Sequence, residues 1–170
     1  NGTDVMGSIG LPVPSTDVKL VDDNNNTVPL GQPGELCVKG PQVMEGYWNR
    51  PEDTKQVLID GWLHTGDVAT MEESGFFKIV DRKKDMIKTG AENVSSREVE
   101  ECIYRLAGVM EVAVVGLPDP QWIEAVTAVV VLKTGAQATE SEVIEHTKTL
   151  ASFKRPKRVI FTDKLPKNAT

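Results

Sequence analysis

Four side chains near the middle of the sequence could bind a ligand that carries a sugar and phosphates, and Asp67 is the first of them. It follows Gly66, and a glycine lets the backbone approach a ligand closely while the neighbouring carboxylate faces it. A carboxylate can accept hydrogen bonds from both hydroxyls of a vicinal diol, which is the arrangement in ribose. An ordinary turn, in which Asp67 binds its own backbone, is the alternative, and the spacing alone does not decide between them.

A run of charged residues begins near Arg82 and holds the other three candidates. Residues 81–88 contain four cations and two acids, which predicts a site for a polyanion rather than a plain surface loop. Arg82 follows an apolar-alternating segment, and a guanidinium there can hydrogen-bond ribose or phosphate oxygens; a surface ion pair is the alternative. Lys84 and Lys88 are four residues apart, so on an extended segment both point to one face, and ordinary solvated lysines are the alternative.

The elements that position these residues change in kind near Lys84. Before it, alternation and turn residues predict strands at residues 18–22, 34–40, 62–71 and 76–81, and the last two form a hairpin. Asn49 is predicted to be the N-cap of a short helix with Pro51 in its first turn. A boundary that falls at a charged run, and not in a flexible linker, suggests a hinge whose position matters for chemistry.

After Lys84, helices and strands are mixed. Capping boxes pair Ser95 with Glu98 and Thr139 with Glu142, and apolar residues at helical spacing follow each of them. Strands are predicted at residues 112–115, 126–132 and 158–161, and the β-branched character of the first two predicts strands covered on both faces. The mixture places this part of the chain in the α+β class.

Composition narrows the function classes further. With 170 residues, 39% hydrophobic and 26% charged, the chain is typical of a globular protein of one ordinary domain or two small ones. A net charge of −6 argues against general attraction to nucleic acid or to anionic membranes. The longest apolar run, residues 125–132, is too short to span a bilayer. Cys37 and Cys102 are expected to be buried thiols in a reducing compartment, hence in the cytoplasm.

Five motifs in a fixed order resemble the adenylate-forming superfamily, which contains acyl-CoA synthetases, firefly luciferase and the adenylation domains of peptide synthetases. They cover nearly the whole chain, at residues 34–48, 61–67, 75–98, 111–119 and 153–157. Any one motif alone is weak evidence for this superfamily, whereas all five in this order are specific to it. The residues of these motifs are most similar to those of a long-chain fatty-acid–CoA ligase.

The resemblance implies an α+β fold in two parts. Residues 1–83 are then the C-terminal subdomain of a large N-terminal AMP-binding domain, a β-rich piece at the end of a distorted β-barrel. Residues 84–170 are then a small mobile C-terminal domain with a three-stranded sheet, a hairpin and flanking helices. The family's adenylation lysine follows a Pro-Lys-x-x-x-Gly-Lys pattern, and residues 166–170 stop two residues short of it. We therefore expect this domain to be truncated before the catalytic lysine and the chain alone to be inactive.

The resemblance also implies roles for particular residues. Those implied for nucleotide binding are Asp67, Ile79 and Arg82. Lys84 stands where the family places its hinge residue, and Lys88 is implied as a catalytic residue that faces the active site after rotation. The turn implied to border the coenzyme A channel consists of Thr89, Gly90 and Ala91, with Ala91 where the family often has a second glycine. No metal ligand is expected among these residues.

The implied reaction uses ATP with Mg²⁺, a fatty acid and coenzyme A. An adenylation domain that loads a carrier protein, or a non-catalytic lid or interaction module, are the alternatives. Neither a nucleic-acid partner nor a transmembrane segment is expected. A homo-oligomer is left open, as is peripheral association of a cytoplasmic enzyme with a membrane.

Overall fold

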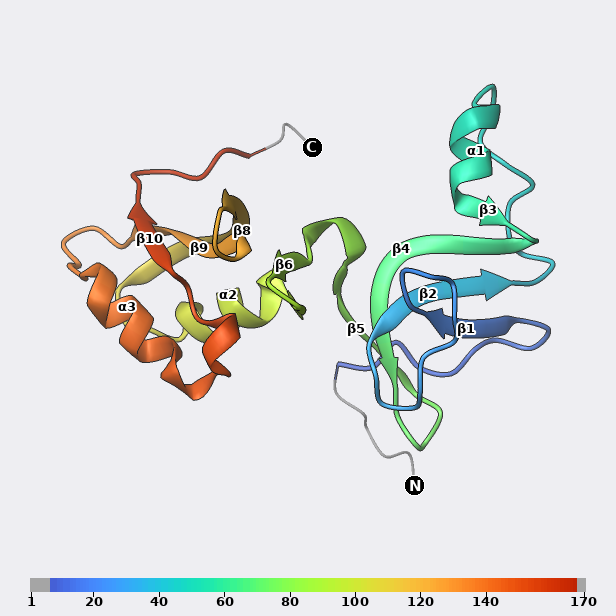
Figure 1. Ribbon diagram of the computed structural model, residues 1–170, viewed down its shortest axis with the longest axis horizontal. Coiled ribbons are helices and arrows are strands. Elements are labelled where there is room, and N and C mark those ends of the chain that lie inside the picture. The colour runs from blue at the N-terminus through green and yellow to red at the C-terminus, as the bar shows by residue number, and fades with distance from the viewer. Residues whose placement is uncertain (1–6, 168–170) are drawn as a thin grey trace. The chain divides into compact units, whose positions relative to one another are not determined.

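The computed structural model describes residues 7–167, and the chain divides into two compact units, residues 1–84 and 85–170 (Figure 1). Both units combine a five-stranded sheet with short helical segments, which confirms the α+β class. No helix in the described part of the chain is long and apolar enough to cross a membrane.

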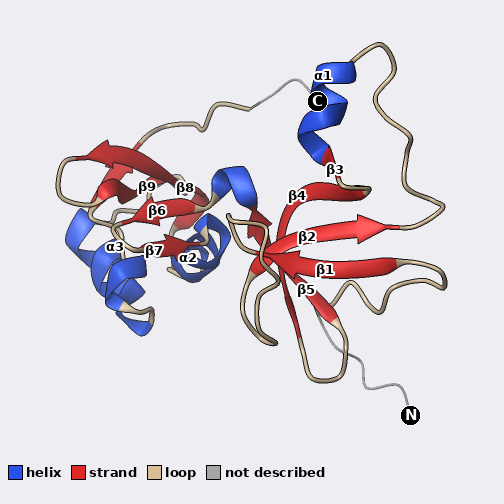
Figure 2. Cartoon of the chain, turned by 45° about the vertical axis from the view of Figure 1, so that its right-hand side comes forward, coloured by secondary structure: helices blue, strands red, loops and turns tan. Residues whose placement is uncertain are grey.

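The first unit is built around the long strand β4. β2 pairs with one edge of β4, while β3 and β5 pair with the two ends of its other edge, and all pairs are antiparallel (Figure 2). The strands are β1 (Asp17–Val21), β2 (Gly34–Lys39), β3 (Leu58–Ile59), β4 (Trp62–Met71) and β5 (Phe77–Arg82). The predicted hairpin is confirmed, since Gly75 N–H donates to the Glu72 carbonyl in the turn between β4 and β5. A small core of Leu20, Leu36, Ala69 and Phe77 lies on the sheet.

The short helix α1 (Pro51–Val57) begins one residue later than predicted. Its N-cap is Arg50, and Asn49 has a left-handed φ of 54°, so the prediction of Asn49 as N-cap is wrong. Asparagine tolerates the left-handed region better than most residues, and here it turns the chain just before the helix. The Arg50 side chain forms an ion pair with Asp53, at 2.6 Å, and does not cap the helix.

The second unit contains a sheet in which β9 is central. β8 pairs with one edge of β9, and β10 and β6 with the other; only the β10–β9 pair is parallel. β6 and β7 form a hairpin, and a single residue pair, Thr89 with Ile123, joins it to β9. The elements are β6 (Ile87–Thr89), β7 (Glu92–Val94), α2 (Ser96–Tyr104), β8 (Val109–Asp119), β9 (Ile123–Leu132), α3 (Glu140–His146) and β10 (Arg158–Phe161).

Helices α2 and α3 lie on the same side of this sheet, and the core fills the space between them and the strands (Figure 2). Val99 and Ile103 of α2 and Val143 of α3 pack in one cluster with the buried valines of β9. Coverage on both faces is confirmed for β9 and is wrong for β8. Only Val109 and Val114 of β8 are buried, and Val115, for example, is 41% exposed.

The two predicted capping boxes differ in the structure. At α3 the box is complete: Thr139 Oγ1 accepts from Glu142 N–H, and the Glu142 carboxylate accepts from Thr139 N–H at 2.7 Å. At α2, Ser95 Oγ accepts from Glu98 N–H, but the Glu98 carboxylate accepts from Lys154 Nζ at 2.7 Å. A charged donor makes the stronger bond to a carboxylate, so Glu98 here connects α2 to the segment around Lys154.

Candidate functional site

Asp67 and Arg82 are direct cross-strand partners on β4 and β5. Arg82 Nε lies 3.0 Å from Asp67 Oδ1, and the two side chains are 58% and 29% exposed, respectively. The structure therefore brings these two predicted site residues together and leaves both accessible to a ligand. A carboxylate beside a guanidinium on one sheet surface offers an acceptor and a donor to the hydroxyls of a sugar.

Hydrogen bonds of Thr65 fix the segment before Asp67, and the Asp67 carboxylate faces the neighbouring strand β5. Gly66 has φ of 73°, a left-handed conformation that favours glycine. Thr65 Oγ1 accepts the Asp67 N–H at 3.1 Å and donates to the Leu36 carbonyl at 2.8 Å. The Asp67 carboxylate pairs with Arg82 across the hairpin, so it is not occupied by a local turn of its own backbone.

A β-bulge lies beside this pair. Val68 pairs with Asp81 and Ala69 with Ile79, so Val80 is an extra residue on β5. Bulges change the direction of neighbouring side chains and are common next to functional sites. Ile79, the third residue predicted to bind nucleotide, packs against the core of the first unit, and its role stays a prediction.

The charged run after β5 is neither extended nor a free cluster of cations. Lys83–Asp85 form a single 3-10 turn, so the prediction that Lys84 and Lys88 share one extended face is wrong. Lys83 Nζ lies 3.0 Å from Glu35 Oε2 and 3.2 Å from Asp23 Oδ1. Two of the four cations, Arg82 and Lys83, thus already face carboxylates, which removes most of the argument for a general polyanion site. Lys84 is exposed.

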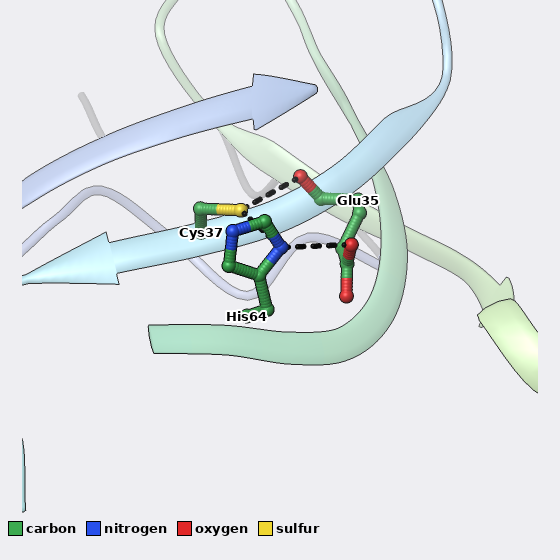
Figure 3. A group of neighbouring side chains, drawn as sticks. All are labelled: Glu35, Cys37 and His64. Carbon is green, nitrogen blue, oxygen red and sulfur yellow. Dashed lines mark hydrogen bonds and ion pairs between the residues drawn. The ribbon is translucent and has the colours of Figure 1, made fainter. Parts of the chain in front are cut away.

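Glu35 is the buried centre of a hydrogen-bonded group in the first unit. Figure 3 shows its carboxylate beside His64, whose Nδ1 lies 3.0 Å from Glu35 Oε2, and shows Cys37 next to the same ring. Gly66 N–H donates to Glu35 Oε1 at 3.2 Å. Burial acts to raise the pKa of Glu35, but the bonds from His64 and Lys83 outweigh it and hold that pKa below its ordinary value of 4.5.

Glu35, Cys37 and His64 also carry ligand atoms that lie within 4.8 Å of one another, which raises the question of a metal. Burial, together with the charge of Glu35, raises the pKa of the Cys37 thiol to about 11, so the thiol stays protonated near neutral pH. The carboxylate is occupied by Lys83. We therefore interpret the group as a hydrogen-bonded network. It is the one such group in the described residues, and its thiol and imidazole do not suit Mg²⁺, which prefers oxygen ligands.

The residues predicted for thioester chemistry lie on the β6–β7 hairpin of the second unit. Lys88 is exposed on β6, and its N–H donates to Glu124 Oε2 at 2.7 Å. Gly90 has φ of 63° at the turn and donates its N–H to the Trp122 carbonyl at 2.6 Å. Thr89 is buried, whereas Gly90 and Ala91 are exposed. The β8–β9 connection thus fixes the backbone of the turn and leaves its tip open.

Glu35 and Lys83, which lie beside the candidate site, were not predicted from the sequence. A signal for Glu35 was available, because an acidic residue within the apolar segment of residues 34–38 has to find partners if the strand is buried. Nothing in the local sequence identifies the partners, since His64 and Lys83 are 29 and 48 residues away.

Comparison with known proteins gives the class to which these features belong. Residues 1–48 match the AMP-binding enzyme family, and residues 98–170 match the AMP-binding enzyme C-terminal domain. The chain therefore belongs to the AMP-binding, adenylate-forming enzymes. Asp67 and Arg82 lie between the two matched segments.

The individual relatives are about three times as long as this chain. A long-chain-fatty-acid–CoA ligase of Escherichia coli O6:H1 is 56% identical over 162 residues, which are 95% of this chain and 29% of that protein. The ATP-bound MatB of Rhodopseudomonas palustris has a TM-score of 0.86 at 41% identity, with 96% of this chain and 33% of MatB covered. The o-succinylbenzoate CoA synthetase MenE of Bacillus subtilis, in complex with its acyl-adenylate intermediate, has a TM-score of 0.87 at 34% identity, with 97% and 34% covered. The chain thus spans about a third or less of the length of these relatives.

Proposed function

We propose that this chain is the C-terminal part of an AMP-forming long-chain fatty-acid–CoA ligase. The observation that carries the proposal is the exposed Asp67–Arg82 pair, with its carboxylate and guanidinium 3.0 Å apart. The 56% identity to a long-chain-fatty-acid–CoA ligase over 95% of the chain supports the choice of reaction. The solved relatives, one with ATP bound and one with an acyl-adenylate intermediate, support these two as substrate and intermediate.

The proposed reaction has two steps. In the first, a fatty-acid carboxylate oxygen attacks the α-phosphorus of ATP, an acyl–phosphate bond forms, and pyrophosphate leaves. In the second, the sulfur of coenzyme A attacks the acyl carbon, the thiol loses its proton, and AMP leaves. The Asp67 carboxylate accepts hydrogen bonds from the ribose hydroxyls and Arg82 donates to the sugar, so the nucleotide stays fixed through both steps.

A change of conformation between the steps is part of this proposal. The chain divides into units at residues 84 and 85, so Lys84 lies where one unit ends, as expected of a hinge. Lys88 and the turn formed by Thr89, Gly90 and Ala91 lie only a few residues beyond it, on the second unit. Rotation at Lys84 would present them to the acyl-adenylate for the thioester step, and each step thereby uses different groups at one place.

Magnesium would accompany ATP as its complex, and we assign no residue of this chain to hold it. We also propose a cytoplasmic location for the enzyme. The support is chemical: Cys37 and Cys102 are free thiols, and unpaired thiols persist in a reducing compartment.

The test is an assay of the complete ligase with ATP, Mg²⁺ and fatty acids of several chain lengths. We expect fatty-acid-dependent release of pyrophosphate, and release of AMP that needs coenzyme A in addition. The 170-residue chain alone is the control and is expected to release none. A complete protein that releases no pyrophosphate with any fatty acid would contradict the proposed function.

A further inference from the structure

One carboxylate in the first unit contacts residues of β4 and the residue that follows β5. Glu35 lies on β2 and is 8% exposed. Its Oε1 accepts the Gly66 N–H at 3.2 Å, and its Oε2 lies 3.0 Å from Lys83 Nζ and 3.0 Å from His64 Nδ1. An ionised carboxylate only accepts hydrogen bonds, so His64 Nδ1 carries the proton in this bond.

The partners of Glu35 are chain neighbours of the proposed ribose pair. Gly66 immediately precedes Asp67, and Lys83 immediately follows Arg82. The two oxygens of Glu35 therefore bind the backbone of the residue before Asp67 and the side chain of the residue after Arg82. Lys83 is also the last residue before the proposed hinge at Lys84.

Stability alone is a poor explanation for a charge at this position. Replacing a buried ion pair by packed apolar residues is often neutral or stabilising, whereas a single lost partner leaves a costly unpaired charge. What a buried pair does provide is a fixed geometry. Lys83 has a second anchor in Asp23 Oδ1, at 3.2 Å, so the segment that follows β5 is attached to the first unit at two points.

We propose that Glu35 is a positioning residue that connects the nucleotide site to the hinge. Through Oε1 it fixes the Gly66–Asp67 backbone and thereby the ribose-binding carboxylate. Through Oε2 it fixes Lys83 to the first unit, so that rotation of the chain begins at Lys84 and not earlier. The kinetic part of this proposal rests on the proposed ligase function.

The two oxygens can be tested separately in the complete ligase. Glu35→Gln keeps a carbonyl acceptor for Gly66 but loses the ion pair, and Lys83→Met loses the same ion pair from the other side. We expect each variant to slow the thioester step, in single turnover from preformed acyl-adenylate, roughly fivefold or more. Adenylation and the affinity for AMP should stay within about twofold. The double variant should resemble the single ones, because all three lose one interaction.

Glu35→Ala removes both contacts and should in addition weaken AMP binding, measured by titration calorimetry, by roughly tenfold. The matched control is the exposed Lys78–Glu72 pair, on the β4–β5 hairpin of the same unit. Lys78→Met and Glu72→Gln should leave both steps unchanged. Additive effects of Glu35→Gln and Lys83→Met, or an equal loss in both steps, would overturn the proposal.

A readout without catalysis keeps this result separate from the proposed function. Exchange of the Gly66 amide hydrogen, followed by NMR or mass spectrometry, should be faster in Glu35→Ala and unchanged in Lys83→Met. If wild-type ligase makes no acyl-adenylate but the exchange differs as stated, the ligase function fails and the positioning by Oε1 stands. Gly66 protection that is the same in wild type and in a folded Glu35→Ala variant would overturn the positioning role itself.

Discussion

At the scale of single residues, we propose that Asp67 and Arg82 serve in binding more than in stability. Exposed ion pairs contribute about 0–1 kcal/mol to folding, and Arg82 is 58% exposed. A bond from a charged donor to a bound ligand is typically worth about 1.5–3 kcal/mol. A binding role for Arg82 therefore predicts a larger effect of its loss on nucleotide affinity than on the free energy of unfolding.

Replacing Arg82 by alanine is therefore expected to weaken ATP and AMP binding by roughly 1.5–3 kcal/mol while changing the free energy of unfolding by about 1 kcal/mol or less. Calorimetric titration and urea unfolding of the complete ligase measure the two quantities. Lys78→Ala, on the same strand, is the control and should change neither much. An Arg82→Ala enzyme with wild-type nucleotide affinity would remove Arg82 from the site.

The network around Glu35 predicts a pH dependence of stability with a definite sign. Burial acts to raise the pKa of Glu35, but bonds from His64 and Lys83 lower it below 4.5. Because the folded-state pKa lies below the unfolded one, ionised Glu35 stabilises the fold above pH 4.5, and this is lost as the pH falls through the folded value. Lys83, whose own pKa is raised above 10.5, remains charged throughout this range.

The measurement is urea unfolding of wild type and Glu35→Gln at about pH 7 and about pH 3, followed by circular dichroism. Wild type should be more stable than the variant near neutral pH, and the difference should shrink in acid. Glu72→Gln, at an exposed ion pair, should show a small difference at both values. A difference between wild type and Glu35→Gln that stays constant with pH would contradict the assigned pairing.

The sequence allowed Asp67 and Arg82 to be predicted as residues of one nucleotide site, because the family resemblance implies that role for both. It did not allow Glu35 to be paired with Lys83, since a cross-sheet contact between residues 48 apart depends on the register of three strands. A polyanion site was predicted for the same reason: the register that pairs Arg82 and Lys83 with carboxylates of other strands cannot be read from the local sequence. Local sequence shows how many charges there are, and the partners that neutralise them come from elsewhere in the fold.

At the scale of elements, strand positions were well predicted and their surroundings less so. The bounds of β4 match the prediction at residues 62–71, because turn residues delimit that strand on both sides. β8 was wrongly expected to be covered on both faces, since its apolar run does not reveal that helices cover only one side of the sheet. The bulge at Val80 also has no signature in the sequence, although it lies next to the ribose pair.

The 3-10 turn at Lys83–Asp85 is the element that has to change in the proposed rotation. Lys84→Pro fixes φ at this position and restricts Lys83 as well. We expect the thioester step to slow on the order of tenfold more than adenylation, as followed by single-turnover assays of both steps. Lys84→Ala, which does not restrict the backbone, is the control and should leave the rates of both steps unchanged. Equal loss of both steps in Lys84→Pro would argue against Lys84 as the pivot.

At the scale of the whole molecule, the chain holds two units that share one family assignment and divide the proposed chemistry between them. The first carries the ribose pair and its buried support, and the second carries Lys88 and the turn around Gly90. Several apolar residues of the first unit are exposed: Ile9, Leu11, Val13 and Trp48. Since the relatives are about three times as long, we expect further chain to cover some of these residues in the complete ligase.

The central claim is that Asp67 and Arg82 together hold the ribose of the nucleotide, and a crystal structure of the complete ligase with a non-hydrolysable ATP analogue tests it most directly. Both ribose hydroxyls should lie within hydrogen-bonding distance of the Asp67 carboxylate, with the Arg82 guanidinium in contact with the sugar. An ordered nucleotide bound elsewhere, with the Asp67–Arg82 ion pair intact and no ligand atom near it, would contradict that claim.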